Sequence, residues 1–169
     1  DPAAPEDAVP LSHVAETSFK DTFAHLYPPE DLASFLGEWM PPEKVARQIA
    51  DPAMAIRVAR DDAGALVGYI KLGPVDFDLP PTESAQGALE IHQLYMLAAA
   101  KGTGLADQLM RWALAEARAR GAARLYLSVY IDNHRAQRFY ARYGFYEVGK
   151  LAFRVGNTID DDRIWRCDL

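Results

Sequence analysis

The stretch AAAKGTGLADQL, residues 98–109, places Gly102, Thr103 and Gly104 directly before a segment with helical periodicity. Glycine adopts backbone conformations that other residues avoid, so the chain can turn sharply here before the helix begins. The first N–H groups of a helix have no partner within the helix, and they lie at the positive end of its dipole. A glycine-rich helix start is therefore suited to binding an anion, phosphate above all, to which Lys101 and Thr103 can add a charge and a hydroxyl.

Two common phosphate-binding motifs do not fit this stretch. KGTGLA lacks the GxGxxG spacing of dinucleotide-binding proteins, and no lysine follows it as GxxxxGK[ST] requires. Glycine pairs before helices also occur in ordinary turns, so the stretch alone leaves both readings open. The surrounding segments have to decide between a turn and a phosphate site.

Strands and helices alternate around the glycine stretch. Residues 56–72 predict two strands joined at DDAG, and residues 73–87, rich in Pro, Gly and acids, predict a loop. Beyond the loop the pattern predicts strands and helices in the order strand 88–97, helix 104–120, strand 123–130, helix 133–143, strand 144–153 and strand 163–169. This order predicts an α/β (α+β) fold with a mixed sheet and one parallel crossover.

The first third of the chain predicts helices that begin at the proline pairs Pro28–Pro29 and Pro41–Pro42. Half of the 169 residues are hydrophobic, which fits one domain with its own core. The net charge of −6 argues against a nucleic-acid surface, and the single cysteine, Cys167, excludes an internal disulfide. Without a long apolar run or a signal-peptide pattern, we expect a cytoplasmic protein that does not bind membranes.

A second motif lies downstream of the glycine stretch. It follows the pattern Asn-x2-Ala-x2-Phe-Tyr-x3-Gly-Phe at Asn133, Ala136, Phe139, Tyr140, Gly144 and Phe145. Together with Lys101, Gly104 and Ala106, this motif resembles the acetyl-CoA site of the GNAT superfamily of N-acetyltransferases. The flanking segments are most similar to the branch that contains bacterial spermidine and spermine N-acetyltransferases.

This resemblance implies a single domain over residues 1–169 with the acyl-CoA N-acyltransferase fold. Its mixed sheet would splay between the fourth and fifth family strands, with helices on both faces. Residues 88–145 would form the acetyl-CoA core and residues 1–55 the acceptor side, beginning with the end of the first family strand. The donor would be acetyl-CoA as a co-substrate, without a metal. The resemblance assigns its binding to Leu94, Tyr95, Met96, Lys101, Gly102, Thr103, Gly104, Leu105, Ala106, Asn133 and Tyr140.

Acetyl transfer to an amine needs an uncharged amine, a stabilised oxyanion and a proton for the departing thiolate. Because an alkyl ammonium has a pKa of about 10.4, a base is required at neutral pH. Glu90 and His92 lie two residues apart and should project from one face of their strand, so either can accept this proton directly or through water. We favour Glu90, which aligns with the base of histone-acetylating relatives, over His92. By resemblance, the Met96 N–H binds the oxyanion and Tyr140 protonates the thiolate.

The acceptor is open at this stage. Polyamines fit the resemblance and the acids expected near the acceptor side, which are Glu30, Asp31, Glu38, Asp76, Asp78 and Glu83. Another small amine or a protein amine fits the same catalytic residues, and a non-catalytic acyl-CoA sensor would keep KGTGLA without needing Tyr140, Glu90 or His92. We expect a small-molecule amine acceptor, no nucleic-acid partner, and a homodimer formed through the C-terminal strands as in many relatives.

Overall fold

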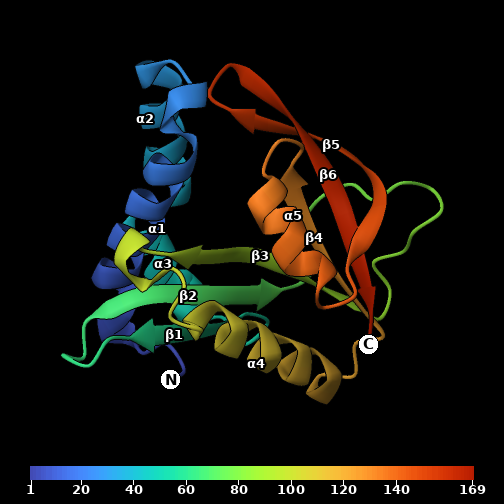
Figure 1. Ribbon diagram of the computed structural model, residues 1–169, viewed down its shortest axis with the longest axis horizontal. Coiled ribbons are helices and arrows are strands. Elements are labelled where there is room, and N and C mark those ends of the chain that lie inside the picture. Colours follow the sequence, from blue (N-terminus) through green and yellow to red (C-terminus); the bar gives the residue numbers. More distant parts are fainter.

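The sheet of this protein has the strand order β1-β2-β3-β4-β6-β5 in a computed structural model that describes residues 1–169 (Figure 1). All neighbouring strands are antiparallel except β3 and β4, which are parallel. The mixed sheet with one parallel crossover is therefore confirmed. The strands are β1 (Ala55–Arg60), β2 (Leu66–Gly73), β3 (Ala88–Met96), β4 (Arg124–Tyr130), β5 (Tyr146–Val155) and β6 (Thr158–Asp168).

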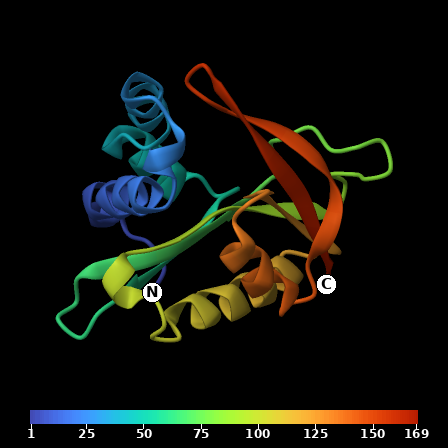
Figure 2. The same cartoon turned by 45° about the horizontal axis from the view of Figure 1, so that its top comes forward.

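Helices cover both faces of the sheet (Figure 2). One core lies between α1–α3 and the face that carries Val58 and Tyr69, and a second lies between α4 and the face that carries Ile70 and Leu72. None of the helices combines the length and hydrophobicity needed to span a membrane. The helices are α1 (Ala8–Phe23), α2 (Pro29–Trp39), α3 (Pro42–Ala50), α4 (Leu105–Ala119) and α5 (His134–Ala141), with short 3-10 turns at Pro5–Asp7, Ala24–Leu26 and Ala98–Ala100.

The two parallel strands diverge soon after they begin. Pairing between β3 and β4 runs only from Ala88 to Glu90 on the β3 side. Beyond Glu90, β3 follows its antiparallel partner β2 to Met96, while β4 follows β6 to Tyr130. The sheet therefore opens into a V, as Figure 1 shows, and the predicted splay is confirmed.

A bulge interrupts β3 inside this V. Lys71–Leu72 of β2 face Gln93 and Ile91, so His92 has no partner in β2. A bulge adds a residue and re-aims the side chains around it. Ile91 packs into the core beside α4. Despite this irregularity, Glu90 and His92 project from one side of the strand as predicted, because the His92 Nδ1 lies 3.4 Å from the Glu90 Oε1.

The hairpin of β5 and β6 is longer than the sequence pattern predicted. Val155 pairs with Thr158, so the turn consists of Gly156 and Asn157, and both strands extend beyond the predicted ends at 153 and 163. The Asp31 carboxylate of α2 accepts hydrogen bonds from the Asn157 N–H (2.9 Å) and the Thr158 hydroxyl (2.8 Å). These bonds hold the tip of the hairpin against α2.

The first residues run beside β1. The Val58 N–H donates to the Asp1 carbonyl (2.8 Å) and the Ala3 N–H donates to the Ile56 carbonyl (2.9 Å). Pro2 forms an isolated antiparallel bridge to Arg57. This pairing agrees with the expectation that the segment is the end of a strand.

We expect Gly156→Ala to lower the free energy of unfolding more than Gly64→Ala does. Both glycines have positive φ, where an alanine costs about 1–2 kcal/mol. A Cβ at Gly156 would also lie 2.5 Å from the Asp31 Cα, whereas a Cβ at Gly64 meets nothing within 4 Å. Urea unfolding of the two variants measures the difference, and equal losses would show that the contact between Asp31 and the turn adds no constraint.

Candidate active site

The glycine stretch forms the start of α4 at the outer end of the V. Gly102 and Gly104 both have φ of +86°, and Gly104 is the N-cap of α4. The Gln108 N–H donates to the Gly104 carbonyl (3.1 Å), which is the first bond of the helical ladder. The N–H groups of residues 105–107 are left without helical partners. This helix start has the donors and the dipole that an anion requires.

Two side chains at the helix start differ in what they can offer an anion. The Thr103 hydroxyl donates to the Ala100 carbonyl (2.7 Å), so it holds the loop in shape and leaves its backbone N–H for a ligand. Lys101 is exposed and forms no ion pair. The nearby Asp107 carboxylate is bound by the Tyr143 hydroxyl and lies 3.4 Å from Arg142, which offsets its charge.

A cleft runs through the V from this helix start toward β6. Its outer part has a volume of about 400 Å³ and includes Lys101, Gly102 and Ala106 at one end. Its inner part has a volume of about 180 Å³ and lies between α1, β3, β4, α5 and the β5–β6 hairpin. The two parts adjoin each other, because they share the lining residues Thr22, Leu94, Tyr95, Asn133, Ala136 and Tyr140.

Most of the predicted donor-site residues line this cleft. Those that line its outer part are Leu94, Tyr95, Met96, Lys101, Gly102, Ala106, Asn133 and Tyr140. Thr103, Gly104 and Leu105 do not line it: Thr103 and Gly104 shape the turn, and Leu105 packs against the core beneath α4. The structure thus brings the glycine stretch and the Asn133–Phe145 motif to one cleft from different sides.

The edge of β3 that faces the cleft has backbone groups without a strand partner. The Leu97 N–H donates to the Val67 carbonyl of the neighbouring chain segment (2.9 Å). Because alternate residues of an antiparallel strand point their backbone groups to opposite edges, Leu94 and Met96 direct theirs away from β2. At that edge β4 has already diverged. An extended ligand can therefore pair with β3 here as an additional strand.

Tyr140 lies where the two parts of the cleft meet. The N-cap of α5, which carries it, is Asn133, whose side-chain oxygen accepts the Ala136 N–H (3.2 Å). The Tyr140 ring packs against Phe139 and Phe145, and its hydroxyl forms no hydrogen bond within the chain. Burial raises the pKa of Tyr140 above the ordinary tyrosine value, so the hydroxyl stays protonated at neutral pH. It is a free donor facing the cleft.

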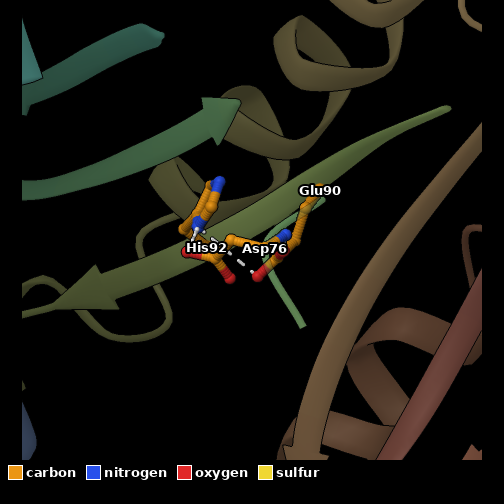
Figure 3. A group of neighbouring side chains, drawn as sticks. All are labelled: Asp76, Glu90 and His92. Carbon is orange, nitrogen blue, oxygen red and sulfur yellow. Dashed lines mark hydrogen bonds and ion pairs between the residues drawn. The ribbon is translucent and has the colours of Figure 1, made fainter. Parts of the chain in front are cut away.

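Glu90, His92 and Asp76 form a cluster at the inner end of β3 (Figure 3). The His92 Nδ1 lies 3.4 Å from the Glu90 Oε1 and 3.5 Å from the Asp76 Oδ2, and Glu90 accepts the Asp76 N–H (2.9 Å). Burial, with a further contribution from Asp76, raises the pKa of Glu90 to about 8. Burial lowers the pKa of His92. Both shifts favour the uncharged forms at neutral pH.

The members of this cluster differ in their access to the cleft. His92 lines the inner part, whereas Glu90 lies behind it. The His92 Nε2 is buried without a hydrogen-bond partner, and its Nδ1 faces the two carboxyl groups. Ligand atoms of the three side chains lie within 4.8 Å of one another, close enough to share a cation. An uncharged Glu90 is a poor ligand for one, and its carboxyl group is already bound by the Asp76 N–H.

The acids that we expected near the acceptor side do not line the inner cleft. Asp31 holds the hairpin tip, and Glu83 pairs with Arg166 (3.0 Å) and accepts the Tyr126 hydroxyl (2.6 Å). The acids that do line it are Asp160 and Asp162 of β6, which the sequence analysis missed. The sequence signal that could have indicated them is the run IDDD at 159–162. Because alternate residues of a strand share a face, this run places Asp160 and Asp162 together on one side.

Comparisons with known proteins identify a family model, relatives and solved structures that are similar to this chain. Residues 17–145 match the model of the acetyltransferase (GNAT) family. An uncharacterized N-acetyltransferase of Mycobacterium tuberculosis is 37% identical over 158 residues, which covers 94% of this chain and 95% of that protein. An aminoalkylphosphonate N-acetyltransferase of Salmonella typhimurium is 36% identical over 100 residues, or 59% of this chain and 62% of that protein. The crystal structure of the PaiA N-acetyltransferase of Thermoplasma acidophilum in complex with coenzyme A has a TM-score of 0.78 at 22% identity, covering 99% of this chain and 96% of that one.

We expect Glu90→Gln to make stability less dependent on pH. Because the folded pKa of about 8 lies above the unfolded value of about 4.3, the free energy of unfolding of the wild type falls as pH rises through this window. Glutamine still accepts the Asp76 N–H but does not ionise. The free energy of unfolding of the variant should therefore fall less than that of the wild type as the pH rises. Urea unfolding at about pH 5 and pH 9 measures this difference. The same pH dependence in both proteins would contradict burial as the cause.

Proposed function

The chain belongs to the acetyltransferase (GNAT) family and takes its acetyl group from acetyl-CoA. From this premise we propose that it acetylates the primary amine of a small molecule, with the amine attacking the thioester directly. The observation that carries the proposal is the cleft of two adjoining parts between β3 and β4. Its outer part begins at an anion-binding helix start, and Tyr140 stands at the entrance to its inner part. The donor then occupies the outer part and the amine the inner part.

We assign the pyrophosphate of acetyl-CoA to the start of α4. The positive φ of Gly102 and Gly104 leaves backbone N–H groups exposed there, and Lys101 adds a cation. Lysine acts as a point charge and lacks the planar, multidentate bonding of arginine. The pantetheine arm would pair with Leu94 and Met96 as an additional strand. In this assignment residues 88–145 form the donor core.

The reaction chemistry follows from the groups around the thioester. When the amine attacks, the carbonyl oxygen becomes negative and accepts a hydrogen bond from the Met96 N–H. The carbon–sulfur bond then breaks, and Tyr140 gives its proton to the thiolate. The nitrogen of the intermediate loses its remaining extra proton, which restores the Tyr140 hydroxyl. The products are the acetylated amine and free coenzyme A.

We propose that the Glu90–His92 pair accepts the proton that the ammonium group loses before attack. With a pKa of about 8, Glu90 is mostly protonated at neutral pH and becomes an effective base as the pH approaches 8, while the neutral imidazole of His92 can accept a proton at lower pH. Neither Glu90 nor the ring nitrogens of His92 open directly on the cleft, so the proton would pass through water. Asp76 would orient the imidazole.

The acceptor side would be formed by residues 1–55, through the aromatic rings of α1 and Tyr27 that line the inner cleft. A polyamine is the acceptor that we propose first. A homodimer formed through the C-terminal strands stays a prediction.

A thiol-release assay tests this function. With acetyl-CoA and a panel of polyamines, amino acids and peptides, we expect release of coenzyme A with small amines, and highest with polyamines. Each amine without protein serves as the control. Release with peptides alone would indicate acetylation of a protein amine. If none of the amines tested causes release, the result would favour a non-catalytic acyl-CoA sensor.

We expect Tyr140→Phe to lower kcat by about 100-fold or more, the usual contribution of a general acid. Its affinity for acetyl-CoA, measured by calorimetry, should change little because the ring is retained. Tyr146→Phe is the matched control, since the Tyr146 hydroxyl binds Asp168 (3.0 Å) and does not line the cleft. A Tyr140→Phe variant with unchanged kcat would remove this hydroxyl from the acid role.

A further inference from the structure

The inner part of the cleft is negatively charged. Asp160 and Asp162 line it, and no lysine or arginine does. The rest of its wall is largely aromatic, with rings from α1, β4 and β5 and from the segment between α1 and α2. These rings belong to Phe19, Phe23, Tyr27, Tyr130 and Phe153.

The acids of β6 differ in how their charges are compensated. Asp161 points to the other face of the strand, is exposed, and pairs with Arg163 (2.9 Å). Asp160 and Asp162 face the cleft and form no ion pair. Asp160 is held in place by a hydrogen bond from the Tyr27 hydroxyl. The cleft therefore contains two uncompensated carboxyl groups on one strand face.

Asp162 is the more enclosed of the two, with 7% of the residue exposed. Burial, followed by the neighbouring Asp160 and Asp161, raises its pKa to about 7, and only the Ser128 hydroxyl acts in the opposite direction. A buried carboxylate without a positive partner is costly, and the cost is relieved when a cation binds. A ligand with a positively charged group can therefore supply the partner that Asp162 lacks.

Resting on the proposed function, we propose that Asp160 and Asp162 bind a second ammonium group of the acceptor. The acceptor would be a flexible diamine or polyamine with no acidic group near its amines. The aromatic rings would contact its methylene chain and attract its charge through cation–π interactions. Tyr140 lines the same cavity, so the other amine of the chain can reach the thioester while the first stays bound.

The same charges work against acidic acceptors. A carboxylate or phosphonate in the inner cleft would meet Asp160 and Asp162 without any lysine or arginine to bind it. The Salmonella relative is named for an aminoalkylphosphonate. We therefore infer that this chain takes a different class of amine from that relative.

Acceptors of equal length separate these possibilities. We compare putrescine, butylamine and gamma-aminobutyrate, whose far ends are positive, neutral and negative. We expect kcat/KM to be at least about tenfold higher for putrescine than for butylamine, mainly through KM, and lowest for gamma-aminobutyrate, since a charge-assisted bond contributes this much. Equal kcat/KM for putrescine and butylamine would overturn the inference while leaving the proposed function standing.

Variants on β6 assign the effect to residues. Asp160→Asn and Asp162→Asn should each reduce the preference for putrescine, whereas Asp161→Asn, on the opposite face of the same strand, should leave it unchanged. Unchanged acetyl-CoA affinity shows that each variant is folded. A preference that survives in both Asp160→Asn and Asp162→Asn would overturn the assignment.

Calorimetry tests the site without turnover. Putrescine should bind the complex of the protein with coenzyme A, and Asp162→Asn should weaken that binding at least tenfold. If no amine releases thiol, the proposed function fails, and this titration still decides whether the inner cleft binds a dication. Absence of putrescine binding to the wild type would contradict such a site.

Discussion

The divergence of β3 from β4 is the constraint on which the rest of this structure depends. Each strand stays with its antiparallel partner, β2 or β6, and the parallel contact ends at Glu90. Such a gap leaves backbone groups of β3 without a strand neighbour, which a folded protein normally avoids. In the proposed function, the extended arm of a bound donor would satisfy these groups. The unpaired edge is therefore both the structural weakness of the sheet and the feature that suits it to its co-substrate.

Opposite charges lie at the two ends of the cleft. The outer end has the positive helix start of α4 and Lys101, while the inner end has Asp160 and Asp162. In the proposed function, the anionic donor and a cationic acceptor would be drawn to different ends by electrostatic attraction. Tyr140 lies between the two ends, where the reacting groups would meet. The polarity of the cleft would then place both substrates without a conformational change.

Long-range contacts position the inner end of this cleft. The register Tyr130↔Asp162 between β4 and β6 brings the acids to the cavity face, and Asp31 holds the tip of the same hairpin against α2. The bulge at His92 has a comparable effect on β3, since it directs His92 and Glu90 to one cluster with Asp76. Small shifts of register at either place would change which side chains meet the acceptor.

The sequence by itself determined the fold class, and it predicted the splayed sheet and the donor site. These depend on contiguous motifs, KGTGLA and the Asn133–Phe145 pattern, whose spacing fixes local backbone and helix geometry. Only the tertiary structure decided which acids line the inner part of the cleft. Asp31 and Glu83 are acids that we expected on the acceptor side, but their carboxylates bind other groups of the chain. Asp160 and Asp162 instead reach the cleft through the pairing of β6 with β4. Such pairings join residues far apart in sequence, and a one-residue change of register would turn the other face inward. The run IDDD at 159–162 therefore marks two acids on one strand face, but it cannot show that this face reaches the cleft.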